Sequence, residues 1–131
     1  MQKQKAENLK YKEGSGLEAL AVYRKALIFA TAVISLFGHK NKKGQDYLAN
    51  QILRSSTSIG ANIAEGYGRM YSKTFRQFLA VARGSCFETR FWLEIAKTSK
   101  TIDKAQYENL DGDVVELIKI LSTMMKNLEK H

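Results

Sequence analysis

The third quarter of the chain carries a regular series of basic side chains that could bind phosphate groups. Arginine or lysine recurs every seven residues from Arg69 to Lys97, and Lys73 lies three residues before the second member of the series. Seven residues nearly complete two turns of an α-helix, so these side chains form a row about 10 Å apart that drifts only ~20° per repeat. Guanidinium groups in such a row can contact successive phosphates. The predicted nucleic-acid-binding residues are Arg69, Lys73, Arg76, Arg83, Arg90 and Lys97.

The charge of the whole chain favours this interpretation but leaves an alternative open. The 131 residues include 21 lysines and arginines against 13 aspartates and glutamates, a formal net charge of +8. Phe87 and Phe91 are predicted to point outward beside the row, where they can stack on bases or pack on a neighbouring subunit. In the alternative, the row is a solvated face that bridges carboxylates of another subunit. Candidate carboxylates are Glu88, Glu94 and Glu116. Further basic residues favour the nucleic-acid interpretation, and they lie at Lys40, Lys42 and Lys43 and in the lysine-rich first dozen residues.

Residue patterns typical of catalysis or metal binding are weak. Histidine occurs only at His39 and His131, and neither belongs to the Glu-x-x-His pair of di-iron bundles. The hydroxyl residues 55–58 have no histidine nearby in sequence that could activate a nucleophile. The glycines of residues 66–69 follow a predicted helix and lack the Gly-Lys-Ser/Thr triplet of a phosphate loop. We therefore expect no enzymatic activity, no metal site and no cofactor.

The segment that precedes the row has small and polar residues where a helix normally buries large ones. Ser55, Ser58 and Asn62 share one helical face with two isoleucines, so another backbone can approach that face closely. Buried hydroxyl groups there need hydrogen-bond partners, because an unpaired one costs about 1–3 kcal/mol. Gly66 is predicted to end this helix in the left-handed conformation, and Arg54 is a predicted partner for a carboxylate. Structural roles are thus predicted for Arg54, Ser55, Ser58, Asn62, Glu65 and Gly66.

The spacing of apolar residues predicts the fold. Near residues 16–38, 72–98 and 103–129, apolar or small residues alternate three and four positions apart, and the serine-rich segment 45–65 adds a fourth helix. Asp103 and Gln106 have the spacing of a helix-starting capping box. Short connections and the absence of proline favour an all-α, up-and-down antiparallel four-helix bundle. We expect a single domain at residues 15–131, preceded by a basic, mobile segment at residues 1–14.

The first predicted helix has two apolar stripes. Its predicted core stripe is Leu20, Tyr23, Leu27, Ala30, Ile34 and Phe37. The second stripe lies on another face and is predicted to be an oligomer interface, because one small bundle cannot easily bury both faces. The alternative is a single wide apolar face on one helix. The predicted interface residues are Val22, Phe29, Val33 and Leu36.

Cysteine usage and hydropathy predict a cytoplasmic protein. The single cysteine, Cys86, cannot form an internal disulfide, which is typical of a reducing compartment. The longest apolar run, residues 26–37, is shorter than the ~20 residues that a membrane span needs. We expect no association with a membrane.

Two motifs in the chain resemble those of a known family. The pattern R-S-x-x-S-I-x-x-N-I-A-E-G, followed by a basic residue and F-x-x-F-L-x-x-A-x-G-S-x-x-E, is similar to that of bacterial four-helix-bundle proteins encoded within intervening sequences of large-subunit ribosomal RNA genes. The resemblance covers about residues 15–128 and implies the same fold, with no established catalytic chemistry. The matching residues are Arg54, Ser55, Ser58, Ile59, Asn62, Ile63, Ala64, Glu65, Gly66, Phe75, Phe78, Leu79, Ala82, Gly84, Ser85 and Glu88.

This family is in turn distantly similar to the accessory variability proteins of diversity-generating retroelements, which are basic, ring-forming bundles associated with nucleic acid and a reverse transcriptase. The resemblance implies a homo-oligomer, specifically a pentamer, with a reverse transcriptase as a further partner. We therefore expect a non-catalytic bundle that binds RNA or DNA. The alternative is a ring-forming scaffold that binds an acidic protein partner.

Overall fold

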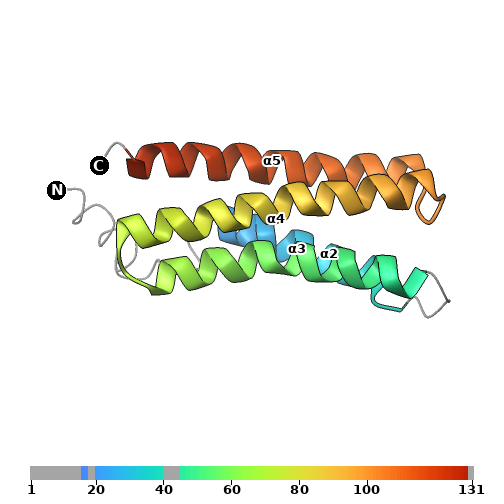
Figure 1. Cartoon of the computed structure of the whole chain (residues 1–131), viewed down its shortest axis with the longest axis horizontal. Coiled ribbons are helices and arrows are strands. Elements are labelled where there is room, and N and C mark those ends of the chain that lie inside the picture. Colours follow the sequence, from blue (N-terminus) through green and yellow to red (C-terminus); the bar gives the residue numbers. More distant parts are fainter. Residues whose placement is uncertain (1–15, 18–19, 40–44, 130–131) are drawn as a thin grey trace.

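The computed structural model describes residues 16–17, 20–39 and 45–129, which contain four long helices joined by short turns (Figure 1). These are α2 (Ala21–Phe37), α3 (Gln45–Gly68), α4 (Ser72–Thr98) and α5 (Lys104–Glu129). The predicted all-α fold is confirmed, and most helix boundaries agree within three residues. The predicted N-terminal segment, residues 1–14, and the lysines of residues 40–43 lie outside the described residues.

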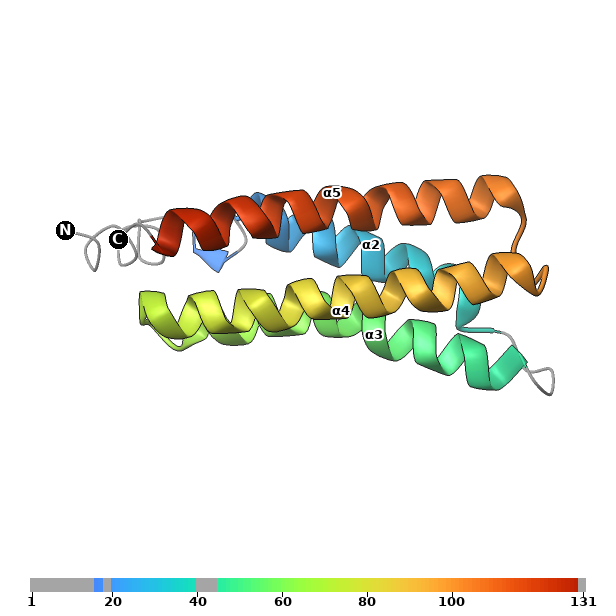
Figure 2. The same ribbon diagram turned by 45° about the horizontal axis from the view of Figure 1, so that its top comes forward.

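Consecutive helices run antiparallel and lie side by side, as expected for an up-and-down bundle (Figures 1 and 2). The most extensive packing joins α3 to α4 and α4 to α5, whereas α2 packs mainly on α3 and makes few contacts with α5. The seam between α2 and α5 is therefore the most open of the four. Within the described ranges, no helix is both long and apolar enough to cross a membrane.

The core face of α2 differs from the predicted one. Val22, Phe29 and Val33, predicted to contact another subunit, are buried inside this chain, and Leu36 is half-buried against the same core. Leu27 and Ile34, predicted to be in the core, are 53% and 49% exposed. The interface assignment is therefore wrong for the three buried residues.

A close contact between small residues explains which face of α2 is buried. A Cβ atom placed on Gly60 of α3 would lie 3.5 Å from the Cβ of Ala26 on α2. Small residues at a helix crossing allow close packing, and this crossing turns Ala26 and its stripe neighbours toward α3. The buried residues of α2 are Val22, Ala26, Phe29, Val33 and Phe37.

The role predicted for Gly66 is also wrong. Helix α3 continues through Gly66 to Gly68, and the left-handed residue after it is Met70, with φ of 74°. A Cβ atom on Gly66 would lie only 2.5 Å from the Cβ of Phe78 on α4. Glycine is needed here because α4 approaches the α3 backbone too closely for any side chain. This close contact packs the end of α3 against the start of α4.

The turn from α4 to α5 follows the predicted capping chemistry. The Gln106 backbone N–H donates to Asp103 Oδ1 at 2.8 Å, and the Asp103 N–H donates to Gln106 Oε1 at 3.0 Å. This reciprocal pair is the predicted capping box. Before it, Lys100 has φ of 63°, and the Thr101 N–H donates to the Ala96 carbonyl oxygen at 2.8 Å, which closes α4 in a Schellman motif. These contacts fix how α5 enters the bundle and hence its position along α4.

Candidate nucleic-acid interface

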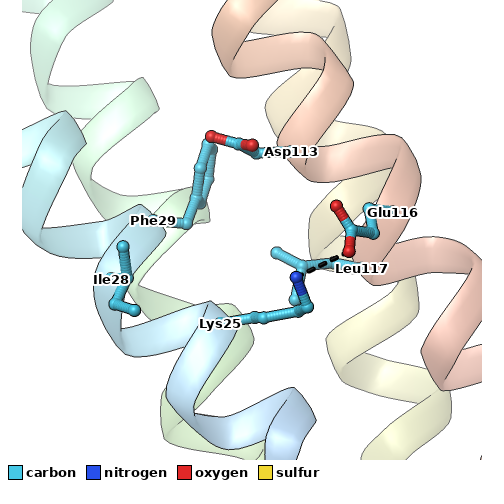
Figure 3. Close-up of a pocket in the computed structure, with 6 residues that line it drawn as sticks. All are labelled: Lys25, Ile28, Phe29, Asp113, Glu116 and Leu117. Carbon is cyan, nitrogen blue, oxygen red and sulfur yellow. Dashed lines mark ion pairs between the residues drawn. The ribbon is translucent and has the colours of Figure 1, made fainter.

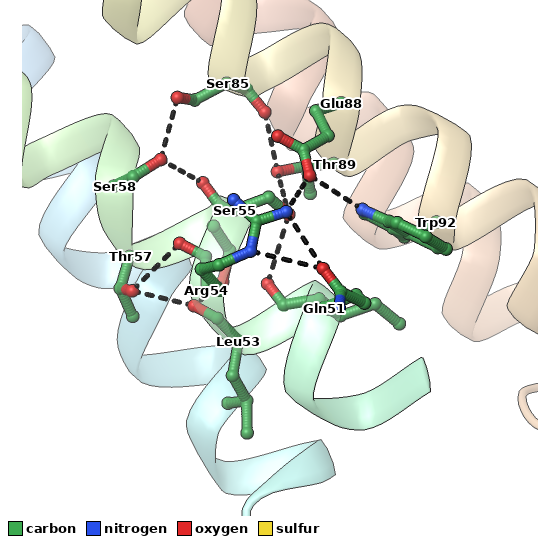
Figure 4. A network of polar contacts seen from close by, with 12 residues as sticks. Gln51, Leu53, Arg54, Ser55, Thr57, Ser58, Ser85, Glu88, Thr89 and Trp92 are labelled. Atoms are coloured by element: carbon green, nitrogen blue, oxygen red, sulfur yellow. Dashed lines mark hydrogen bonds and ion pairs between the residues drawn. The ribbon is translucent and has the colours of Figure 1, made fainter. Parts of the chain in front are cut away.

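The small-residue face of α3 forms a hydrogen-bonded contact with α4 (Figure 4). The hydroxyl oxygens of Ser58 and Ser85 lie 2.7 Å apart, and those of Ser55 and Thr89 lie 2.9 Å apart. Ser55 and Thr89 are fully buried, so these hydroxyl groups find their partners within the contact. Asn62 Nδ2 donates to the Ser58 carbonyl oxygen at 2.8 Å, within α3. The serines predicted to be structural therefore join two helices.

An ionic group lies beside these hydroxyls (Figure 4). The Arg54 guanidinium pairs with the Glu88 carboxylate and also donates to Gln51 Oε1 at 2.9 Å. The Trp92 indole N–H donates to the same carboxylate at 3.0 Å. The hydrogen bond from Trp92, followed by the interaction with Arg54, lowers the pKa of Glu88. Glu65, the other acidic residue of the first motif, pairs with Arg69, just after the end of α3, at 2.7 Å.

The predicted basic row lies along the seam between α4 and α5, apart from Arg69, which follows α3. Arg76 Nε donates to the Met125 carbonyl oxygen at 3.1 Å, and Arg83 Nε donates to Ser122 Oγ at 2.8 Å. Arg90 makes two hydrogen bonds with Asp111, of 2.8 and 3.2 Å. Three successive arginines of α4 thus reach side chains or backbone of α5.

The ion pairs divide this row into two kinds of cation. Carboxylates neutralise Arg69 and Arg90, and Lys97 pairs with Glu94 at 3.4 Å while lying over the Tyr107 ring. The hydrogen bonds with Asp111 raise the pKa of Arg90 further, so this guanidinium is held in a structural ion pair. Among the described residues no carboxylate pairs with Arg83, whose partner is the neutral hydroxyl of Ser122. Lys73 is exposed at the start of α4.

A shallow groove is lined by cations of both helices that carboxylates neutralise weakly or not at all. Its volume is about 230 Å³, and it lies between α4 and the C-terminal part of α5. Arg76, Arg83 and Lys126 line it, with Glu129 as the one acidic residue, and Glu129 reaches Arg76 at a long distance of 3.5 Å. The other lining residues are Ser122 and Met125. We call these six residues the basic groove. Its three cations against one carboxylate suit a phosphate group.

A second hollow, of about 120 Å³, lies on the open seam between α2 and α5 (Figure 3). Phe29, Ile28 and Leu117 form its apolar part, and Lys25 pairs with Glu116 across it at 2.6 Å. Asp113 is the remaining charged residue. Its two carboxylates and one ammonium group are unsuited to a polyanion, so the basic groove is the candidate interface.

The sequence profile of the 23S rRNA-intervening sequence proteins matches residues 18–123 of the chain. The chain belongs to this family. A solved structure of a protein of unknown function from the S23 ribosomal protein family of Bacteroides thetaiotaomicron is also similar. It is 33% identical, with a TM-score of 0.74, and the match covers 81% of this chain and 99% of that one. No curated protein matches the sequence.

Membership of the 23S rRNA-intervening sequence family confirms the resemblance that the two motifs indicated. The structure shows what the residues of these motifs do. Ser55, Ser58 and Ser85 form the hydroxyl contact, Arg54 and Glu88 form the adjoining ion pair, and Gly66 admits Phe78. In this chain, these motif residues hold α3 against α4.

The groove residues of α5, including the cation Lys126, were not predicted as part of the site. Lys126 lies more than forty residues after Arg83 and becomes its neighbour only through the register of the two helices. The seven-residue spacing on α4 contains no information about that register. A weak signal was available, since Ser122 and Lys126 are four residues apart and share a face of α5.

Proposed function

We propose that this protein is a non-catalytic bundle that binds RNA or DNA by holding backbone phosphates in the basic groove. The observation that carries the proposal is the presence of Arg76, Arg83 and Lys126 around one hollow, whose lining among the described residues includes a single carboxylate. Phosphate contacts of this kind are largely independent of base sequence, so little sequence preference is expected. The net charge of +8 would also favour the approach of a polyanion.

The family name gives indirect support, because it refers to sequences inserted in 23S rRNA. The resemblance to accessory variability proteins adds a finer proposal, in which the protein forms a homopentamer and serves a reverse transcriptase in a diversity-generating retroelement. The cytoplasmic location stays a prediction from the sequence. A reverse-transcriptase gene with template and variable repeats beside the coding sequence would support the retroelement proposal, whereas an insertion within a ribosomal RNA gene would count against it.

The second candidate function is a ring-forming scaffold for an acidic protein partner. The exposed apolar residues of α2 favour it, because Leu27, Ile28 and Ile34 are 49–69% exposed on a helix that packs mainly on α3. Such a surface on a small protein often contacts another subunit. This surface replaces the incorrectly predicted stripe as the candidate for self-association.

A salt titration of nucleic-acid binding separates the two functions. We would replace Arg76, Arg83 and Lys126 together with glutamine and measure binding to a duplex DNA by fluorescence anisotropy. Each lost phosphate contact lowers the slope of log affinity against log salt by about 0.9, so the triple variant should lose two to three units of slope. A control with Arg24, Lys100 and Lys104 replaced by glutamine has the same charge but an intact groove, and its slope should stay nearer to that of the parent.

Sedimentation of the same proteins shows whether each keeps its assembly state. Equal slopes for the groove variant and the control would exclude the groove as the binding site. Absence of detectable binding by the parent at low salt would reject the nucleic-acid function for the isolated protein. A groove variant that dissociates or loses a protein ligand would favour the scaffold.

A further inference from the structure

The solvent-facing side of α4 next to the basic groove carries exposed aromatic rings. Phe87 and Phe91 are 47% and 57% exposed. Together with Gly84 they lie at positions i, i+3 and i+7, which places all three on one helical face. A single exposed phenylalanine is not unusual. Two neighbouring rings beside a cationic groove form a surface that is both aromatic and positively charged.

Arg83 connects this face to the basic groove. Its guanidinium carbon lies 5.1 Å from the centroid of the Phe87 ring, and the same side chain lines the groove. A ligand on the rings is therefore close to the groove cations. This combination of aromatic faces and a cationic track is typical of proteins that bind single-stranded nucleic acid.

Gly84 leaves the helix surface bare beside the rings. Glycine inside a helix is destabilising relative to alanine, and Gly84 lies in the middle of α4. At Gly66 the close approach of Phe78 explains why the helix contains a glycine. At Gly84 no such contact exists, because nothing in the described part of the chain lies within 4 Å of a Cβ placed there. The missing side chain instead leaves room for a flat group to reach the helix backbone between Arg83 and Phe87.

We propose that Phe87 and Phe91, with Gly84 and Arg83, form a stacking surface for unpaired bases of an RNA or DNA strand whose phosphates lie in the basic groove. The inference rests on the proposed function and specifies its ligand as single-stranded. Bases of a duplex are paired and stacked on one another, so their faces cannot reach the two rings.

A second copy of the chain fits this surface less well. An apolar partner would cover the rings but would remove water from the Arg83 guanidinium, whose partner on this chain is a neutral hydroxyl. An unpaired nucleotide supplies both a ring for Phe87 and a phosphate for Arg83. The balance of charge therefore favours nucleic acid over a subunit contact.

Trp92 provides a direct signal for this binding. It is the only tryptophan in the chain, and its ring contacts that of Phe91 edge to face, with 5.0 Å between centroids. A base stacked on Phe91 should change the Trp92 fluorescence, whereas a duplex held only by the groove should leave it unchanged.

The experiment compares a short oligo(U) strand with a duplex RNA of the same length, using the parent and two matched pairs of variants. Replacement of both Phe87 and Phe91 by leucine keeps the apolar surface but removes the rings. It should weaken oligo(U) binding roughly 5- to 100-fold and change duplex binding less than about twofold. Its control is Leu27→Ala/Ile34→Ala, which alters exposed apolar residues on another helix.

The second variant separates binding from folding. Gly84→Gln should raise the melting temperature by a few degrees, since glutamine favours a helix, and yet weaken oligo(U) binding by blocking the bare surface. Its control, Gly112→Gln on α5, also enters open space and should raise the melting temperature without affecting binding.

The outcomes distinguish this inference from the proposed function. If the parent binds duplex and oligo(U) in a salt-dependent way but the Phe87/Phe91 variant binds both as the parent does, the stacking surface is wrong and the groove stands. Equal weakening for both ligands would also overturn it. A variant that dissociates into smaller particles in sedimentation while keeping its oligo(U) affinity would identify the rings as a subunit contact. Binding of neither ligand by the parent would reject both proposals.

Discussion

Replacing Gly66 with alanine should destabilise the bundle, although alanine is the better helix former. The added Cβ would lie 2.5 Å from the Cβ of Phe78, 3.1 Å from Cδ1 of Phe75 and 3.2 Å from Cγ of Phe78. The nearest of these atoms is fixed to the α4 backbone, so a side-chain rotation cannot relieve the contact. The two helices would have to separate by about 1 Å to restore an ordinary contact distance.

The expected change in the free energy of unfolding is the sum of two opposing effects. Overpacking a close contact costs about 1–3 kcal/mol, and the contact with a backbone-anchored atom places Gly66→Ala near the upper end. The gain in helix propensity offsets about 1 kcal/mol, which leaves a net loss of about 2 kcal/mol and a fall in melting temperature of roughly 6–10 °C.

Thermal unfolding followed by circular dichroism measures this loss, with Gly112→Ala as the matched control. The same chemical change at Gly112 meets no atom of another described segment within 4 Å, so the control should gain up to about 1 kcal/mol. A Gly66→Ala protein as stable as the parent would show that α3 and α4 are not in close contact there.

Three other predictions concern individual side chains. Arg90→Gln should lower the free energy of unfolding by about 1–2 kcal/mol in urea titrations, because the mostly buried Asp111 loses two charge-assisted hydrogen bonds; an unchanged midpoint would contradict this. Lys100→Gly should stabilise the protein by about 1 kcal/mol in the same assay, because Lys100 has φ of 63° in the Schellman turn; a destabilised variant would show that this turn is not left-handed. Burial raises the pKa of the Cys86 thiol from 9.0 to about 12, so folded protein at pH 8 should react with a thiol reagent only as fast as the bundle unfolds around this residue. The free energy of unfolding should also decline between pH 9 and 12, because the thiol of the unfolded chain loses its proton first. Rapid labelling of native protein at pH 8 would contradict the burial.

Local patterns were sufficient to predict the helices. The alternation of three and four residues, the short polar breaks and the Asp103–Gln106 pair all depend on neighbours in sequence. The structure confirms the four helices and the capping pair that they predicted. The spacing also predicted that the serines of α3 face another helix. The identity of their partners, Ser85 and Thr89, depends on the register of α3 against α4, which is a property of the folded chain.

The errors arise from contacts between distant segments. Both stripes of α2 have helical spacing, and the choice between them depends on the meeting of Ala26 with Gly60. The basic row was predicted from its spacing, but spacing cannot show that the Asp111 carboxylate neutralises Arg90, whereas Arg83 donates to the neutral hydroxyl of Ser122. For this reason only two cations of the row, Arg76 and Arg83, line the groove, where Lys126 of α5 lies beside them.

The most direct measurement of the central claim compares two arginines from the same row. Arg83→Gln and Arg90→Gln each remove one positive charge, at positions seven residues apart on α4, but of the two only Arg83 lines the basic groove. We would measure the salt dependence of duplex DNA binding for the parent and both variants by anisotropy, at a temperature where all three are folded. The slope should fall by about one unit for Arg83→Gln and stay at the parent value for Arg90→Gln. An unchanged slope for Arg83→Gln, or the same fall for both variants, would contradict phosphate binding in the groove.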